Sequence, residues 1–431
     1  MKNVLYLLIH LGMITGLLSG CQVDQKSTSS LPTFTLIPTD TFRFNHFVDC
    51  NMASAWVGDT FRIFPGKYGE DPVWGHALDL KYAEGTTPDE VFSRPTSDYQ
   101  APKMPLNAKV GEKGLHGAVW FESVYQSPKD PKILYALYHN ENYPETLPFD
   151  PITGEGYKNE NWPLGLTERI TPAAVPRIGI MKSMDGGKSW ENKGIILEDL
   201  QDRMILKPFN TSKTFAGGVG DPSAVASGDF LYIFYGEYGY PGKFDPNTYD
   251  PEKERKGQCI SVARIALKDL DNPQGKAVRW NGKSFSGDWN GIGSPIPALQ
   301  ISLENGGGPA SSPKGGFHWG PSVSWNTYLK AWVMLMGHVE GQSWVGDKVY
   351  ISFNTEPDLA KGVDNWSTPQ LLVEKPGRIL WYPSLQPMNI PEHIDQKYTS
   401  MKLGREARLF YKFAEEGRYL SEYRIQFNRP K

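Results

Sequence analysis

The chain has 431 residues, of which 39% are hydrophobic and 22% are charged. This apolar content is sufficient for a packed core and excludes a disordered protein. The 45 Lys and Arg residues nearly balance 48 Asp and Glu, for a formal net charge of −3, which excludes a strongly basic nucleic-acid-binding surface. The 13% aromatic content, with 44 Gly and 34 Pro, favours strands joined by turns. We therefore expect an all-β fold.

The first 20 residues have the pattern of an export signal. Lys2 precedes a short apolar run at positions 4–18, and the run ends in the tetrapeptide LSGC, which closes on Cys21. The run is shorter than the ~20 apolar residues that a spanning helix needs. The tetrapeptide resembles the lipobox of bacterial lipoproteins, which implies cleavage before Cys21 and acylation of its thiol. An ordinary secretory signal is the alternative.

This pattern sets the expected domain boundaries. Residues 1–20 are a lipoprotein signal peptide, residues 21–44 a lipid-anchored flexible tether rich in Ser and Thr, and residues 45–431 the folded domain. The expected location is the cell envelope, on the outer membrane or cell surface or facing the periplasm. Only Cys50 and Cys259 then remain, and two buried thiols are favoured over a disulfide.

Five similar units follow along the chain. Each unit opens with a small or polar residue, continues as a short strand and returns through a turn into an aromatic strand. The units lie at residues 47–54 with 60–64, 117–124 with 132–139, 221–235, 320–336, and 382–385 with 407–413.

Further strands at 177–183, 259–265, 348–353 and 419–427 complete the units. Repeated antiparallel four-stranded units are typical of a β-propeller, so we predict five blades with expanded loops. A six-bladed sialidase-like propeller and a β-sandwich with insertions are the alternatives.

One local motif is specific. The segment SMDGGKSW, from Ser183 to Trp190, resembles the Asp-box of sialidases and other propellers. Asp and Ser side chains can bond the backbone of such a turn, so we expect a structural role for Asp185.

The wider pattern resembles the five-bladed propeller glycoside hydrolases of the furanosidase-like group, including families 32, 43, 117 and 130. Its opening strands carry Asp49, Glu122, Asp221 followed by Pro222, His318 and Tyr382. The resemblance implies a glycosidase with an axial pocket, in which Asp49 is the general base and Asp221 tunes the acid or fixes the sugar. The residues that flank Asp49 depart from the family pattern.

Glycosidic cleavage independently requires two carboxyl groups, one protonated and one ionised. Glu122, Glu141 and Glu237 lie near strand ends and are all candidates for the general acid. Glu141 is preferred because His139 lies two residues away. The predicted catalytic set is therefore Asp49, Asp221 and Glu141.

Other residues supply the predicted sugar contacts. Aromatic faces stack on sugar rings, and imidazole or carboxyl groups can bond hydroxyls. The predicted substrate-binding set is His116, Glu122, His139, His318, Trp319 and Tyr382. The resemblance implies no required cofactor, and it leaves room for a structural calcium ion beside His318 in the central channel.

The expected function is hydrolysis of an oligosaccharide or polysaccharide, with the membrane as a second partner through the lipid anchor. A non-catalytic surface glycan-binding lipoprotein would keep the aromatic residues and need no acid/base pair. A sialidase-like exo-glycosidase would need three convergent arginines, for which Arg62, Arg169, Arg177, Arg264 and Arg378 are available.

Overall fold

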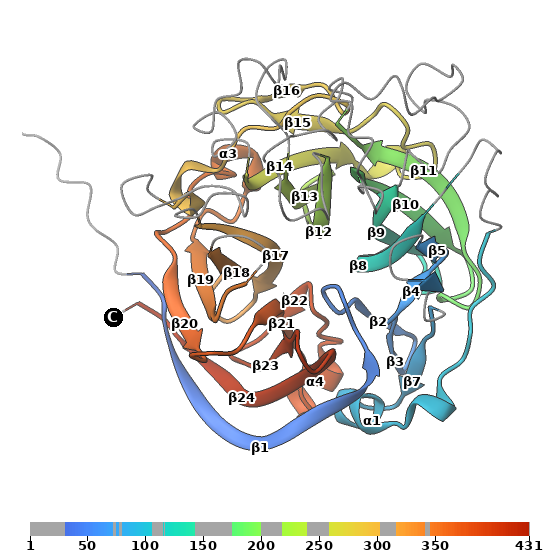
Figure 1. Ribbon diagram of the computed structural model, residues 1–431, viewed down its shortest axis with the longest axis vertical. Helices are drawn as coiled ribbons and strands as arrows, with labels where there is room; N and C mark the ends of the chain where they lie inside the picture. The colour runs from blue at the N-terminus through green and yellow to red at the C-terminus, as the bar shows by residue number, and fades with distance from the viewer. Residues whose placement is uncertain are drawn as a thin grey trace, which may run out of the picture.

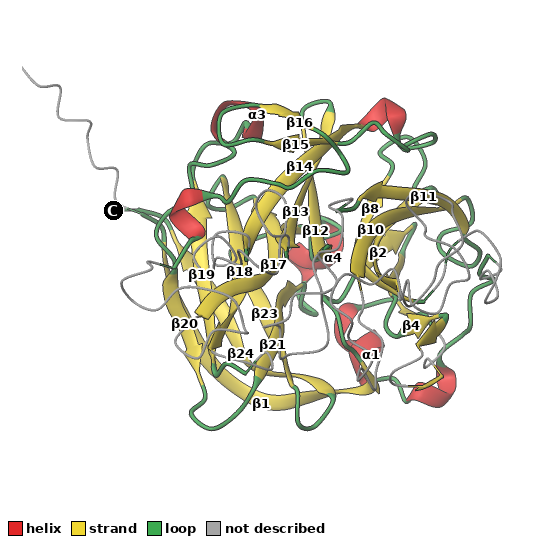
Figure 2. Cartoon of the chain, turned by 45° about the horizontal axis from the view of Figure 1, so that its top comes forward, coloured by secondary structure: helices red, strands yellow, loops and turns green. Residues whose placement is uncertain are grey.

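The computed structural model describes residues 31–71, 75–76, 80–105, 115, 117–142, 175–199, 218–238, 258–301, 316–340 and 345–430. Among them, strands form five sheets arranged radially around one axis, and a separate two-stranded sheet (Figure 1). This arrangement is a five-bladed β-propeller, so the predicted fold class is confirmed. Helices are few and short (Figure 2).

The blades follow one another in chain order. Blade 1 contains β2 (Ser54–Val57), β3 (Thr60–Ile63) and β7 (Ala83–Gly85). Blade 2 contains β8 (Ala118–Gln126), β9 (Leu134–Asn142), β10 (Val175–Ser183) and β11 (Glu191–Leu197), with β4 (Lys67–Tyr68) beside β8. Blade 3 contains β12 (Val219–Ser227), β13 (Phe230–Glu237), β14 (Cys259–Ala266), β15 (Val278–Trp280) and β16 (Phe285–Gly287).

The last two blades each include a strand that is distant in the sequence from the other strands of the blade. Blade 4 contains β17 (Gly316–Asn326), β18 (Ala331–Glu340), β19 (Lys348–Asn354) and β20 (Gln370–Glu374), with β22 (Lys402–Leu403) parallel to β17. Blade 5 contains β21 (Leu380–Gln386), β23 (Glu406–Phe413), β24 (Arg418–Asn428) and β1 (Thr33–Phe47).

Short elements fill the connections between these strands. They are β5 (Glu70–Asp71), β6 (Gly75–His76), α1 (Pro88–Ser93), η1 (Thr96–Asp98), η6 (Leu267–Asp269), η7 (Pro297–Leu299), α3 (Leu359–Gly362) and α4 (Pro391–Asp395). No helix in the described part of the chain is long and apolar enough to cross a membrane.

The ring of blades is closed by strand β1. It pairs antiparallel with β24, from Thr33 opposite Asn428 to Phe47 opposite Arg418, and becomes the outermost strand of blade 5 (Figure 1). Pairing the first strand with the last removes the open ends of the ring. The predicted tether of residues 21–44 is therefore wrong in its second half, because residues 33–44 belong to the propeller. The signal peptide and Cys21 lie outside the described residues.

The opening strand predicted at residues 47–54 is also misplaced, because β2 begins only at Ser54. The segment before it is buried but carries no strand pairing. Cys50 and Cys259 are free, buried thiols, as the sequence favoured.

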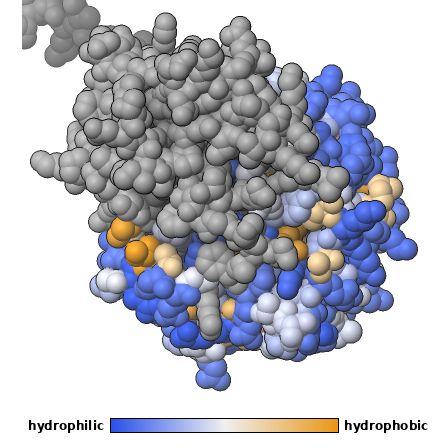
Figure 3. All heavy atoms as spheres, turned by 45° about the vertical axis from the view of Figure 1, so that its right-hand side comes forward, coloured by the Kyte–Doolittle hydropathy of each residue, from blue (hydrophilic) through white to orange (hydrophobic). Residues whose placement is uncertain are grey.

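Apolar side chains fill the spaces between neighbouring blades. Five buried clusters lie between blades 1 and 2, 2 and 3, 3 and 4, 4 and 5, and 5 and 1. Leu335 of blade 4 and Leu409 of blade 5, for example, belong to one cluster and are both 0% exposed. Truncating such a side chain costs about 2–5 kcal/mol. The outer surface visible in Figure 3 is mostly hydrophilic wherever described residues show.

Candidate active site

Four innermost strands share an irregularity at the same level of the axis. The pairing register shifts between Phe121 and Ser123 in β8, Gly220 and Ser223 in β12, Trp319 and Ser322 in β17, and Trp381 and Ser384 in β21. Three of these bulges contain a proline, which has no N–H to donate to the sheet. A bulge redirects the side chain that it contains.

The residues in these bulges include the candidates for chemistry. Glu122, Asp221 and Tyr382 occupy three of them, and Gly320 occupies the fourth. Asp221 and Tyr382 have positive φ angles of 49° and 50°, a conformation that L-residues rarely adopt. Such strain is concentrated at functional sites, so the shared geometry supports a common role at the axis.

Glu122, His139 and Asp221 form a buried cluster. One ligand atom from each lies within 4.8 Å of the others, and all three side chains are at least nine-tenths buried. They come from β8, β9 and β12, so two neighbouring blades build the cluster. Two carboxyl groups this close cannot both ionise without strong mutual repulsion.

Glu122 is the carboxyl group held in its protonated form. Burial raises the pKa of Glu122 well above its usual range, and the negative charges of Asp221 and Asp49 raise it further. The hydrogen bond that the Asn51 amide donates to Glu122 Oε2, at 2.6 Å, acts in the opposite direction. The net effect is a raised pKa that favours the protonated form, the form that a general acid requires.

Asp221 is fixed on both sides. The Tyr238 hydroxyl donates to its Oδ2, and its backbone N–H donates to His139 Nδ1 at 3.1 Å. Oδ1 lies 3.4 Å from the same Nδ1. Asp221 therefore has its orientation set by blades 2 and 3 together.

His139 can switch between two contacts with Asp221. Burial lowers the pKa of His139, but the bond to Asp221 and its charge raise it more, so the net shift is upward. The neutral ring accepts from the Asp221 amide, and the protonated ring donates to Oδ1 instead. Gly220 makes this approach possible, because a Cβ there would lie 2.6 Å from the His139 ring.

Asp49 is more accessible and is paired with a buried lysine. Lys412 Nζ lies 2.5 Å from Asp49 Oδ1, with side-chain exposures of 2% for Lys412 and 30% for Asp49. The ammonium also lies 5.1 Å from the centre of the Trp381 ring. A carboxylate facing an ammonium and still reaching solvent is suited to act as a base or nucleophile.

Aromatic residues form one wall beside these carboxyl groups. Burial raises the pKa of Tyr382, and the charges of Asp221, Asp49 and Glu122 raise it further, which places Tyr382 beside all three. Its ring packs edge-on against Trp319, with ring centres 5.0 Å apart. Trp319 is only 3% exposed, so its ring packs against Tyr382 and leaves no open face for a sugar to stack on.

The other two acid candidates lie in different environments. Glu141 is half-buried near the end of β9, and its charge acts on His139. Glu237 is 0% exposed and pairs with Arg279 at 2.7 Å, while Gly293 N–H donates to the same oxygen. Of these three candidates, Glu122 is the one that belongs to the buried cluster with His139 and Asp221, and the acid role of Glu141 stays a prediction.

The histidine predictions have different outcomes. His139 lies in the cluster, and His116 lies outside the described residues. His318 lies outside this cluster: its Nδ1 is 2.9 Å from Leu299 O, and its ring packs against His338 and Tyr350, so its role in sugar binding stays a prediction. Burial lowers the pKa of His318 to about 4, so the ring is neutral.

The cluster of Glu122, His139 and Asp221 offers few ligands to a calcium ion. Calcium prefers six to eight oxygen ligands, and this group offers two carboxylates and one imidazole. The carboxylate and imidazole atoms already accept hydrogen bonds from Asn51, Tyr238 and the Asp221 amide. This cluster is therefore not suited to calcium, and the calcium ion expected beside His318 stays a prediction.

Sequence reasoning missed Lys412, Tyr238 and Asn51. Lys412 lies in β23, Tyr238 follows the end of β13, and Asn51 lies in the segment before β2. Asn51 also donates from Nδ2 to Pro321 O at 3.0 Å, across the axis.

The turn at residues 183–190 has structural contacts. Asp185 Oδ1 accepts from the backbone N–H groups of Lys188 and Ser189, and Ser183 Oγ accepts from Gly187 N–H. Trp190 packs against Phe64 and Phe121 in the space between blades 1 and 2. Asp185 therefore holds the hairpin and takes no part in the cluster.

The arginines expected in a sialidase do not converge. Each of the four that the structure describes has a local partner: Arg62 pairs with Glu84, Arg177 with Glu198, Arg378 with Glu415, and Arg264 packs over Phe230. These pairs lie in different blades, and Arg169 lies outside the described residues. The blade count also disagrees with the six-bladed alternative.

Comparisons with known proteins give structural likeness without sequence relatives. No family model matches the chain, and no curated protein matches it. A Bacillus subtilis arabinanase is 8% identical over 90% of this chain and 95% of its own, with a TM-score of 0.41.

Two further solved structures show similar values. An α-L-arabinofuranosidase from Lactobacillus brevis has a TM-score of 0.44 at 9% identity, covering 92% of this chain and 95% of its own. The catalytic domain of a Coprinopsis cinerea GH62 α-L-arabinofuranosidase has a TM-score of 0.43 at 10% identity, covering 93% and 98%. At these values the function has to be argued from the site itself.

Proposed function

We propose that the protein is a glycoside hydrolase that uses Glu122 as general acid and Asp49 as general base or nucleophile. The observation that carries this proposal is the contrast between the two carboxyl groups at one end of the axis. Glu122 is buried with a raised pKa, and Asp49 is partly exposed and faces Lys412. Environments that separate two carboxyl groups in this way assign acid and base roles in glycosidases.

The remaining residues support these two. Asp221 raises the pKa of Glu122 and is itself held by Tyr238 and His139, so it keeps the acid protonated until substrate arrives. Tyr382 and Trp381 are partly exposed and can stack on a sugar ring. The substrate class is an oligosaccharide or polysaccharide.

The experiment is a screen followed by matched variants. The purified chain from residue 22 onwards is tested on aryl glycosides and on plant and host polysaccharides. On any substrate that is cleaved, Glu122→Gln and Asp49→Asn should each lower turnover by roughly 10²–10⁴-fold. Glu141→Gln, the matched control, should change turnover by less than about tenfold.

Two results would reject the assignment. Saccharide binding without cleavage of any bound ligand would favour a glycan-binding protein. A larger loss in Glu141→Gln than in Glu122→Gln would return the acid role to Glu141.

We also propose that the protein is anchored to the cell envelope by lipid on Cys21. The support is the sequence before Cys21, together with the position of the first propeller strand at Thr33, which leaves a short linker. Two or more acyl chains give stable membrane residence. Cys21→Ser should release soluble protein, and unchanged membrane partitioning of that variant would reject the anchor.

A further inference from the structure

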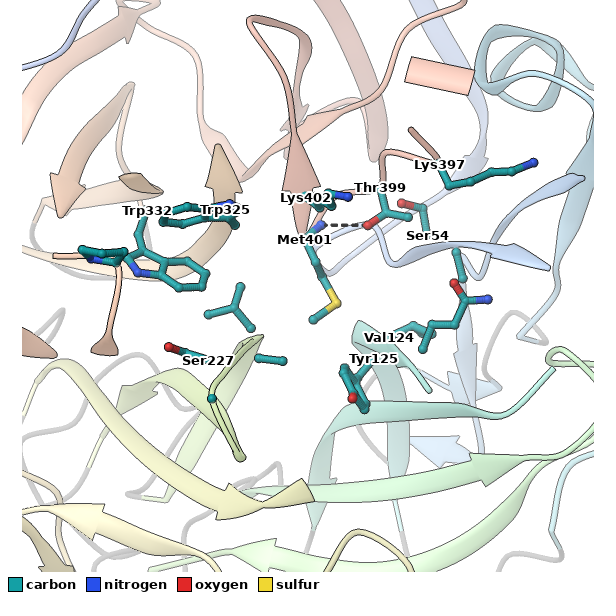
Figure 4. A pocket seen from close by; sticks show the side chains of 16 residues that line it. Ser54, Val124, Tyr125, Ser227, Trp325, Trp332, Lys397, Thr399, Met401 and Lys402 are labelled. Carbon is teal, nitrogen blue, oxygen red and sulfur yellow. Dashed lines mark hydrogen bonds between the residues drawn. The ribbon is translucent and has the colours of Figure 1, made fainter. Parts of the chain in front are cut away.

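A pocket lies at the opposite end of the axis from the carboxyl groups. Strand β12 carries Asp221 near its start and reaches this pocket at Val225, so the two sites are roughly 13 Å apart at ~3.3 Å per residue. The pocket has a volume of about 500 Å³. Residues from the inner parts of blades 1 to 4 line it, together with the segment 397–402 (Figure 4).

The pocket is held in shape by backbone hydrogen bonds. The segment 397–402 runs beside β17, where Trp325 N–H donates to Met401 O at 2.9 Å. Ser400 N–H donates to Ser54 Oγ at 3.0 Å, which ties the same segment to blade 1. Thr399 Oγ1 accepts from Met401 N–H at 3.2 Å (Figure 4). A preformed cavity of this size is suited to a small ligand.

The lining combines aromatic faces with cationic groups. Trp325 and Trp332 lie on one side and Tyr125 on another, with Lys402 and Lys397 along a third edge (Figure 4). Trp325 and Tyr125 are half-buried, so part of each ring remains exposed. Partly exposed aromatic rings among hydroxyl and amide groups match the alternating apolar and polar faces of a sugar.

The charge of the lining is positive. It contains Lys397 and Lys402 and no acidic residue. Lys397 contacts Asp59 at 2.7 Å, but Asp59 is fully exposed and such surface pairs are weak. Lys402 is exposed, with Nζ 5.8 Å from the Tyr398 ring. The Lys397 ammonium also lies 4.7 Å from the centre of the Trp56 ring, so a carboxylate on the ligand would be complemented mainly by Lys402.

We propose that this pocket is a non-catalytic binding site for a short acidic saccharide, one or two sugar rings of which at least one carries a carboxylate. The site would hold the protein on an acidic glycan while the opposite end of the axis remains open. The inference does not depend on the hydrolase proposal, because it concerns binding by residues that the proposed chemistry does not use.

The test is calorimetric titration with two matched probes. Digalacturonic acid carries the carboxylates, and galactobiose is its uncharged counterpart with the same ring stereochemistry. Titrations use the parent chain and the Glu122→Gln variant, so that binding is read without hydrolysis. We expect digalacturonic acid to bind at least about tenfold more tightly than galactobiose, and its affinity to fall with added salt.

Variants locate the binding. Lys402→Gln should weaken digalacturonic acid about tenfold, and Trp325→Ala should weaken it further. Lys361→Gln, at an exposed lysine outside the pocket, is the matched control and should bind like the parent. Because Lys402 is exposed, its variant folds even if Trp325→Ala does not.

Three outcomes would overturn the proposal. The first is that digalacturonic acid gives no heat of binding at ~10 mM, a concentration that detects even millimolar affinity. The second is that galactobiose binds as tightly as digalacturonic acid. The third is that Lys402→Gln binds digalacturonic acid with the affinity of the parent. Binding to this pocket with no hydrolysis of any substrate would leave the inference intact and reject the hydrolase instead.

Discussion

The ion pair between Glu237 and Arg279 offers a test of the fold that is separate from the chemistry. Both side chains are 0% exposed and lie 2.7 Å apart in blade 3. Arg279 also donates to the Tyr235 hydroxyl at 2.9 Å and to Glu198 O at 2.8 Å. Glu237→Gln keeps the shape and the acceptor for Gly293 N–H, and it removes only the negative charge.

The expected cost follows from this burial. Leaving one partner of a buried pair uncompensated costs about 3–5 kcal/mol. The charge of Asp199 also acts on Arg279, which favours the lower end of that range. For 431 residues the entropy of unfolding is about 0.9 kcal/mol/K, so Tm should fall by roughly 3–6 °C.

Differential scanning calorimetry measures this shift, with turnover per folded molecule measured alongside. Glu191→Gln is the control, because Glu191 pairs with Lys193 on the surface with 70% of its side chain exposed. The control should move Tm by less than about 1 °C. An unchanged Tm in Glu237→Gln would refute the reasoning, and a specific loss of turnover would make Glu237 a candidate acid again.

Three further outcomes are expected. Asp221→Asn removes a charge that raises the pKa of Glu122, so the alkaline limb of the pH profile of kcat/KM should move to lower pH. Asp229→Asn, at an exposed residue, is the control and should leave that limb in place. An unmoved limb in Asp221→Asn would contradict the coupling between Asp221 and Glu122. The raised pKa of Glu122 lets the folded state keep a proton that the unfolded state loses above pH ~4.5. The free energy of unfolding therefore falls as pH rises from ~4.5 toward the raised pKa of Glu122 in the folded state. Glu122→Gln should therefore gain Tm relative to the parent as pH rises above ~4.5 in thermal unfolding scans, and a pH-independent difference would contradict it. Asp185→Asn should lower Tm and leave turnover per folded molecule unchanged, and a selective loss of turnover would place Asp185 in the chemistry.

Much of the blade pattern could be predicted because similar units of a short strand, a turn and an aromatic strand recur along the chain. The strands predicted at 259–265 and 348–353 match β14 and β19 within a residue. Strand β1 was not predicted, although Phe34, Leu36, Ile37, Phe42 and Phe44 make residues 33–44 about as apolar as the chain as a whole, because its place in the fold comes from pairing with β24. Its partner lies almost 400 residues away in the chain, a relation that local pattern does not contain.

The site residues likewise include some that the sequence could identify and some that it could not. Asp221 and Tyr382 were found because they open recognisable units and precede prolines, whereas Asp49 was found through the family resemblance and lies in a segment that forms no strand. The roles of Glu122 and Glu141 were not separable from sequence, because burial and like charge decide between them. Lys412 was missed because nothing in its strand distinguishes an inward lysine from a surface one.

The most direct test of the central claim is the dependence of Glu122→Gln on the leaving group. An acid catalyst matters most when the departing oxygen is basic, and least when the leaving group departs without a proton. The account predicts a loss of roughly 10²–10⁴-fold on a saccharide or alkyl glycoside, and a loss of less than about tenfold on the dinitrophenyl glycoside of the same sugar. Asp49→Asn should lose turnover on both substrates. Equal losses in Glu122→Gln on the two substrates would contradict the assignment of Glu122 as the general acid.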